Sequence, residues 1–302
     1  MAQKTQRRRI GRQRRNWIGW VLTAPFAAVF LAFLLLPLGY ALWMSLRSSS
    51  LIGGDRWVGI DNYVKAMQDP LFLKGILFVI AFTVVLVPVQ MLVSLSAALV
   101  LDSLTSRFAK ASRLIIFVPY AVPAVIGALM WGFLYSPDFG PLKDVFGAFG
   151  ADAPNLLASG NVFGALVNIV TWQWAGYYMI IIYAALKGID PTIYEAARLD
   201  GASAWQIAVR IKVPMVSSAL VLILVFAIIG TLQFFTEPQI LKSVSGGSID
   251  AAFTPNMYAY STAFSYGQFN YSLAISFVLG AVVFIGSAIF MTATRKRSGI
   301  AS

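Results

Sequence analysis

Cysteine and histidine are both missing from this sequence of 302 residues, which removes two of the commonest reactive side chains. Without cysteine there can be no disulfide framework, thiol nucleophile or cysteine-ligated metal. Without histidine there is no imidazole base, no histidine-containing triad and no usual imidazole metal site. We therefore expect a chain that is not an enzyme and that binds no cofactor or metal of its own.

Charged residues are also scarce, at 12% of the chain, while 59% of the residues are hydrophobic and the mean hydropathy is +0.76. These values lie far outside the usual range for a soluble domain. The net charge of +11 could suggest nucleic acid, but the Lys and Arg residues cluster between apolar runs instead of covering a polar face. The sequence predicts an integral membrane protein surrounded by lipid, with no nucleic-acid partner.

Six apolar segments are long enough to cross a hydrocarbon core of about 30 Å, which takes about 20 residues of helix. The predicted fold is an all-α integral membrane protein with six transmembrane helices. The first segment follows a basic stretch but is too long for the apolar part of a signal peptide, so we expect it to be retained. The predicted spans are residues 17–45, 71–101, 114–135, 162–186, 214–235 and 271–292. The prolines that predict kinks or breaks in or beside these spans are Pro88, Pro119, Pro123 and Pro214.

The distribution of positive charge predicts how the spans are oriented. With the N-terminus inside, 17 of the 23 Lys and Arg residues fall on the cytoplasmic side, and eight of the 12 acidic residues fall on the other. The positive-inside rule therefore places both basic tails, residues 1–16 and 293–302, in the cytoplasm together with the loop at 187–213. The external segments near 47–70, 136–161 and 236–270 are rich in turn residues and predict short surface elements.

Two further absences limit how such a protein could be driven. The interiors of the predicted spans hold no ionisable residue. The nearest ones, Glu237, Arg113 and Lys74, lie near span ends, where their side chains can reach the interface. A proton-driven pump or a voltage sensor would therefore lack its charged groups. The GxxxxGK[ST] phosphate-binding loop is absent too, so any ATP must be bound by another subunit.

Uncharged polar and aromatic residues concentrate in TWQWAGYY at 171–178 and TLQFFTEP at 231–238. An unpaired amide is costly in lipid, so these residues should face protein or a water-filled path. These residues could simply hold neighbouring helices together through hydrogen bonds. Alternatively they line a path for a neutral, hydroxyl-rich solute, since sugar rings stack on aromatic faces and hydrogen-bond to amides. The candidate solute-path residues are Gln173, Trp174, Tyr177, Tyr178, Gln233 and Thr236.

The charged stretch YEAARLDGASAWQIAVRIKVP predicts a short helix-turn-helix knob on the cytoplasmic side. Asp190 can cap a helix that ends at Gly201, and Ser203 can cap a second helix that leads into the next span. The small side chains of Ala196 and Ala197 share a face and would let another surface approach closely. A solvated amphipathic loop is the simpler interpretation of such charges.

The spacing within this stretch is more specific than its charge. The pattern Glu195-Ala196-Ala197, three residues, Gly201, nine residues, Ile211-x-Val213-Pro214 resembles the EAA signature of permeases of binding-protein-dependent ABC importers, with Val213 where Leu is usual. LDGAS at 199–203 and WVGIDNYVKAMQDPLF at 57–72 are similar to the sugar-type branch, the relatives of the maltose permease that come first in a permease pair.

This resemblance implies a type I ABC importer permease (MetI-like) fold in a bacterial or archaeal cytoplasmic membrane. The chain would form the pathway of an ATP-driven carbohydrate importer with a second homologous permease, and an external solute-binding protein would deliver the sugar. The knob would be the coupling helix that docks on a cytoplasmic ABC ATPase dimer, which holds the ATP and Mg²⁺. The residues that the resemblance assigns to coupling are Glu195, Ala196, Ala197, Asp200 and Gly201.

One alternative from a different class stays open, a self-sufficient secondary transporter or channel for a small polar solute. It would move solute through this chain alone in liposomes, without an ATPase or a second permease. The spans contain no cluster of cationic residues, which favours a neutral sugar over a phosphate-bearing solute. The identity of the sugar does not follow from the sequence.

Overall fold

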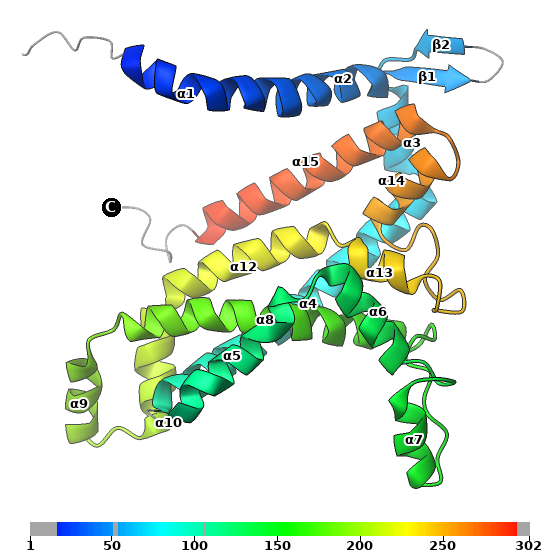
Figure 1. Ribbon diagram of the computed structural model, residues 1–302. Helices are drawn as coiled ribbons and strands as arrows, with labels where there is room; N and C mark the ends of the chain where they lie inside the picture. Colours follow the sequence, from blue (N-terminus) through cyan, green and yellow to red (C-terminus); the bar gives the residue numbers. More distant parts are fainter. Residues whose placement is uncertain (1–16, 51–53, 105–106, 295–302) are drawn as a thin grey trace, which may run out of the picture.

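The computed structural model describes residues 17–50, 54–104 and 107–294, which are mostly helical (Figure 1). The expected basic tails lie outside these residues, apart from the end of the last helix. The elements in chain order are α1 (Trp17–Phe30), the π-helical turn η1 (Leu31–Leu35), α2 (Leu36–Ser45), β1 (Arg47–Ser50), β2 (Gly54–Trp57), α3 (Asp61–Gln68), α4 (Pro70–Ser103), α5 (Arg107–Ala121), α6 (Ala124–Leu134), α7 (Pro141–Ala148), α8 (Val162–Lys187), α9 (Pro191–Leu199), α10 (Ala204–Ile207), the π-helical turn η2 (Ala208–Lys212), α11 (Val213–Met215), α12 (Ser217–Leu232), α13 (Thr236–Leu241), α14 (Pro255–Phe264) and α15 (Phe269–Thr294).

Among the described residues, five stretches of helix are long and apolar enough to cross a membrane, and a bent pair of helices supplies the sixth crossing. The six crossings correspond to the six predicted spans. The five stretches are Gly19–Ser45, Pro70–Ser103, Val162–Lys187, Ser217–Leu241 and Phe269–Thr292, and the bent pair is Lys110–Ala121 with Ala124–Leu134.

The third span is not the single helix that we expected over residues 114–135. It bends by 98° between α5 and α6, where Pro123 is the N-cap residue of α6. Proline has no N–H to donate, and it disfavours the helical conformation in the residue before it, which is consistent with a break at Val122 and Pro123. Pro88, by contrast, lies inside α4, which continues past it to a length of 34 residues.

The bundle is held together chiefly by the packing of α8 against α4 and α5. Buried polar side chains of α4 reach across to α8: Gln90 Nε2 donates to the Val170 carbonyl at 3.2 Å and Ser94 Oγ to the Ala175 carbonyl at 3.0 Å. On the other face of α8, Gly176 lies so close to α5 that an added Cβ would fall 2.0 Å from the carbonyl oxygen of Ile116. These contacts fix the helices that surround the site described below.

The first span stands apart from this bundle. In Figure 1 α1 runs at a distance from the other helices, and only α2 and the hairpin β1–β2 approach α3 and the start of α15. Large apolar side chains of this span are exposed, including Trp20, Phe26 and Phe33. Such a surface is compatible with a hydrocarbon environment, because the helix satisfies its own backbone hydrogen bonds.

A carboxylate caps α4 at the end of the bundle opposite α9. Asp69 Oδ1 accepts the backbone N–H of Leu71 at 2.9 Å, and its Oδ2 accepts the hydroxyl groups of Tyr258 at 2.6 Å and Tyr271 at 2.8 Å. Burial alone would raise the pKa of Asp69, but these hydrogen bonds outweigh it and hold the pKa below its usual value. The cap joins α4 to α14 and α15, although the three elements are far apart in the sequence.

The two ends of the bundle carry different elements (Figure 1). The start of α1, the end of α15 and the pair α9 and α10 lie at one end, whereas α3, α7, α14 and the hairpin lie at the other. The hairpin pairs antiparallel, with Arg47 opposite Trp57 and Ser50 opposite Gly54, and it is the one departure from helix among the described elements.

Candidate functional site

The knob between α8 and α12 forms through local capping. Asp190 Oδ1 accepts the backbone N–H of Thr192 at 2.9 Å and its hydroxyl at 2.8 Å, which starts α9 and lowers the pKa of Asp190. Gly201 follows α9 with φ +84°, a left-handed conformation that a residue with a side chain rarely adopts. The first helix of the knob and its glycine turn are therefore as predicted.

The second helix begins with a reciprocal cap. The Ser203 N–H donates to Gln206 Oε1 at 2.7 Å, while the Gln206 N–H donates to Ser203 Oγ at 3.3 Å. The helix α10 then widens into the π-helical turn η2 before it reaches α11 and α12. Ser203 is the cap that we expected, whereas the hydrogen bond from the Ser203 N–H to the Gln206 side chain was not predicted.

The knob presents both polar and apolar surface. Glu195, Ala196, Asp200 and Gly201 are exposed, and Ala197 is half-buried. Leu199 and Trp205 are 90% and 75% exposed, although neither was predicted as a site residue. Large exposed apolar groups beside charges are typical of a surface that binds another protein.

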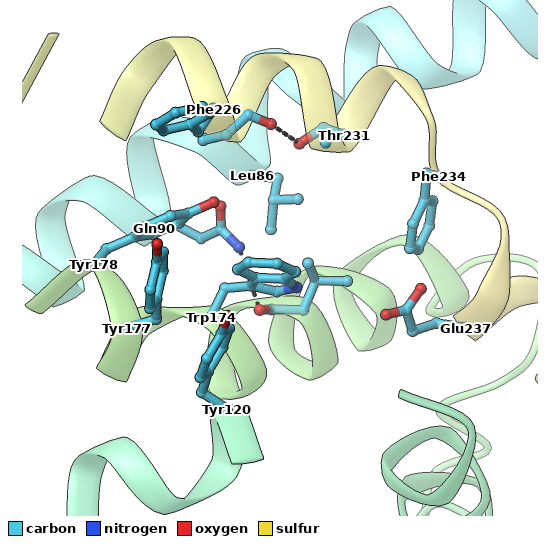
Figure 2. A pocket seen from close by; sticks show the side chains of 13 residues that line it. Leu86, Gln90, Tyr120, Trp174, Tyr177, Tyr178, Phe226, Thr231, Phe234 and Glu237 are labelled. Carbon is cyan, nitrogen blue, oxygen red and sulfur yellow. Dashed lines mark hydrogen bonds between the residues drawn. The ribbon is translucent and has the colours of Figure 1, made fainter. Parts of the chain in front are cut away.

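A cavity of about 400 Å³ lies in the bundle between α4, α5, α8, α12 and α13 (Figure 2). Its volume is within the range of small-molecule sites, about 300–1,000 Å³. The residues that line it are Leu86, Gln90, Tyr120, Val170, Trp174, Tyr177, Tyr178, Phe226, Ala227, Gly230, Thr231, Phe234 and Glu237.

Aromatic rings from two helices form one wall of this cavity. Tyr120 of α5 stacks on Tyr177 of α8, with ring centroids 4.5 Å apart and an angle of 17° between the rings. Trp174 meets Tyr120 edge to face at 5.4 Å and lies 6.0 Å from Tyr178. The close approach of α5 and α8 at Gly176 is what brings Tyr120 within reach of the α8 rings.

Glu237 supplies a carboxylate to the same cavity. We expected this residue near a span end with access to the interface, and that expectation is wrong, because Glu237 is only 7% exposed. Its side chain extends toward the cavity from α13, on the side away from Tyr177 (Figure 2). Two other polar side chains of the lining are already bonded to the protein, Gln90 to the Val170 carbonyl and Thr231 to the Ala227 carbonyl. No Lys or Arg of the described chain lines the cavity.

Three of the six candidate solute-path residues line this cavity, namely Trp174, Tyr177 and Tyr178. Gln173 points elsewhere, and its Nε2 donates to the Val122 carbonyl at 3.4 Å, at the break between α5 and α6. Gln233 is exposed and lines a separate groove that faces α15. Thr236, at the start of α13, lines neither of these two cavities.

The residues that the sequence did not indicate come mostly from other helices. Gln90 and Tyr120 are polar or aromatic residues in apolar runs, a signal that we applied only to the fourth and fifth spans. Glu237 was missed because the predicted fifth span ended before it, whereas the helical crossing continues to Leu241. Within the described residues, no three Asp or Glu side chains come together as a metal site would require.

Comparisons with known proteins agree with this architecture. Residues 90–296 match the family described as binding-protein-dependent transport system inner membrane component. The lactose transport system permease protein LacF of Rhizobium radiobacter is 30% identical over 92% of this chain and 94% of its own. The diacetylchitobiose uptake system permease protein NgcF of Streptomyces coelicolor is 29% identical, over 90% of this chain and 80% of its own.

Two further similarities extend the comparison. The sn-glycerol-3-phosphate transport system permease protein UgpA of Escherichia coli O157:H7 is 29% identical, over 90% of this chain and 92% of its own. A chain of a bacterial ABC transporter that imports the acidic polysaccharide alginate has a similar structure, with a TM-score of 0.83, 21% identity and coverage of 96% of this chain and 98% of that one. At that identity the likeness concerns the fold.

Proposed function

Because the chain belongs to the inner-membrane components of binding-protein-dependent transport systems, we propose that it is the permease of an ATP-driven importer of a neutral carbohydrate. The observation that carries the proposal is the cavity in which aromatic rings and the Glu237 carboxylate face one another. Two of the similar permeases are named for lactose and diacetylchitobiose, which are saccharides. The chain is a multi-pass membrane protein, so the bundle is the part that solute would cross.

The chemistry of the cavity supports a neutral solute. Aromatic faces bind the apolar faces of sugar rings, while a carboxylate accepts hydrogen bonds from their hydroxyl groups. A phosphate or carboxylate on the solute would find no described Lys or Arg in the lining to compensate its charge. The cavity therefore favours hydroxyl-rich solutes over anionic ones.

The knob is the part of the chain that we assign to energy coupling. Glu195, Ala196, Ala197, Asp200 and Gly201 would dock on a cytoplasmic ABC ATPase dimer that binds ATP and Mg²⁺, so that this chain itself is not catalytic. The start of α1 and the end of α15 lie on the same side as the knob (Figure 1), which is the side that the positive-inside rule predicts to be cytoplasmic. A second permease would complete the pathway, and an external binding protein would deliver the solute.

The test uses the tagged chain purified with the subunits that accompany it, reconstituted with the binding protein that co-purifies. Lactose or diacetylchitobiose should stimulate ATP hydrolysis, whereas sn-glycerol 3-phosphate should not. Trp174→Ala should lower saccharide uptake with the ATPase still bound, because it removes the ring at the centre of the aromatic wall. Gln233→Ala, in a separate groove, is the matched control. Stimulation by sn-glycerol 3-phosphate alone, or uptake that falls only in Gln233→Ala, would reject the assignment. Uptake by this chain alone in liposomes would favour a secondary transporter.

A further inference from the structure

A carboxylate at the end of α4 holds both ends of the knob. Asp102 Oδ1 lies 2.7 Å from Lys187 Nζ, and Asp102 Oδ2 lies 2.5 Å from Lys212 Nζ. The side chain of Asp102 is 5% exposed and that of Lys212 is 14% exposed, whereas that of Lys187 is 50% exposed. The Asp102–Lys212 pair is thus largely removed from solvent, and the contact with Lys187 is at the surface.

The two lysines that pair with Asp102 come from opposite ends of the knob. Lys187 is the last residue of α8, directly before the knob, and Lys212 is the last residue of η2, near the end of the knob that leads into α12. One carboxylate from a third helix therefore ties together the two points where the chain leaves and re-enters the bundle. Lys212 Nζ also lies 4.8 Å above the ring of Tyr194, which belongs to α9, so the contact reaches into the knob.

The same helix connects this cluster to the cavity. Gln90 and Leu86, which line the cavity, lie on α4 with Asp102, and α4 has no break between them. Twelve residues of α-helix separate Gln90 from Asp102, a length of about 18 Å at 1.5 Å per residue. The contacts of Asp102 therefore give the knob a direct link to the helix that lines the cavity, in addition to the packing of α8 on α4.

We propose that Asp102 is a positioning residue for energy coupling, which fixes both ends of the knob to α4 so that displacement of the knob moves the helix lining the solute cavity. This role rests on the proposed function, because it needs a partner that moves the knob. Lys212 is the principal partner, since its pair with Asp102 is shielded from water, and an exposed ion pair such as that with Lys187 adds little.

Two variants distinguish a role of Asp102 in energy coupling from a role in the stability of the fold alone. Asp102→Asn leaves Lys212 as a mostly buried charge without its carboxylate, and that alone can destabilise the fold. The double variant Asp102→Asn with Lys212→Gln removes both charges of the shielded pair, so it should regain stability without regaining the ion pair that joins the knob to α4. The matched control is Asp250→Asn, which removes the pair with Lys74 at 4.0 Å, where both side chains are more than half exposed.

In the reconstituted complex, the double variant should keep its ATPase subunits but use about fivefold or more ATP per solute imported, the lower range of allosteric coupling. Asp102→Glu should retain most of the coupling, and Asp250→Asn should match the wild type. An unchanged ratio of ATP to solute in the double variant would overturn the proposal.

A second measurement does not depend on the solute. Since the chain has no cysteine, Leu199→Cys on the knob and Val100→Cys on α4 can carry spin labels at two exposed positions. The distribution of distances between the labels should be narrow in the wild-type background and broad in the double variant. The same narrow distribution in both would contradict the role of Asp102, even if the carbohydrate assignment failed in the transport assay.

Discussion

Gly176 is where a single methyl group should separate two helices that form the wall of the solute cavity. It lies in α8 between Trp174 and Tyr177, and its Cβ position faces the backbone of α5. In Gly176→Ala the new carbon would lie 2.0 Å from the carbonyl oxygen of Ile116 and 2.9 Å from the Cα of Phe117. Both are backbone atoms, so no side chain can rotate out of the way.

The size of the effect follows from the overlap. Ordinary contacts of a Cβ begin at 3.4 Å, so α5 and α8 must separate locally by about 1.4 Å to relieve a contact of 2.0 Å. Overpacking of an interior costs about 1–3 kcal/mol, and a clash with backbone belongs at the upper end of that range. At about 2–4 °C per kcal/mol, a loss of about 3 kcal/mol lowers the melting temperature by about 6–12 °C.

The assay is the thermal unfolding of the detergent-purified complex, with Gly164→Ala as the matched control. Gly164 is also in α8, but an added Cβ there has no neighbour within 4 Å, so the control should be unchanged or slightly more stable. The separation should also loosen the stacking of Tyr120 on Tyr177 and reduce solute uptake. If Gly176→Ala unfolded at the same temperature as Gly164→Ala, the close contact between α5 and α8 would be refuted.

Two further predictions concern the two ends of the bundle. Glu195→Lys should reduce uptake and ATPase association without affecting membrane insertion, because it reverses the charge on the exposed face of the knob; normal uptake would exclude a coupling role for Glu195. Asp69→Asn should lower the melting temperature, because the folded state holds the pKa of Asp69 below its usual value. The contribution of the carboxylate is fully present above the unfolded pKa of about 3.9 and is lost as the pH falls through the folded value. The difference between wild type and variant should therefore be constant from about pH 5 to 7 and shrink below about pH 4; a difference that persisted at acidic pH would argue against an ionised cap.

The sequence predicted the knob in detail because its signals are local. The Asp190 cap, the turn at Gly201 and the Ser203 cap each involve residues within a few positions of one another, so composition and spacing suffice. The six crossings were also predictable, since each depends on a long apolar run. The direction of the break at Pro123 was not, because a proline predicts that a helix ends but not at what angle the next one begins.

The cavity was only partly predictable because its lining comes from five helices. Trp174, Tyr177 and Tyr178 were found together since they share one polar segment of α8. Tyr120 joins them through the contact of α5 with Gly176, which no spacing along the chain reveals. Gln173 was grouped with the lining residues because it is next to Trp174 in the sequence. Its side-chain amide instead donates to the carbonyl of Val122, at the break in the third span.

Helix α4 continues without a break from Pro70 to Ser103, and side-chain contacts anchor it at both tips. Its 34 residues measure about 51 Å, well beyond a hydrocarbon core of about 30 Å, so α4 is long enough for both tips to extend past the lipid tails. Asp69 anchors one tip to α14 and α15, and Asp102 anchors the other to both ends of the knob. Gln90 and Leu86 lie between these two anchors, so a displacement of one tip relative to the other changes the tilt of the segment that lines the cavity.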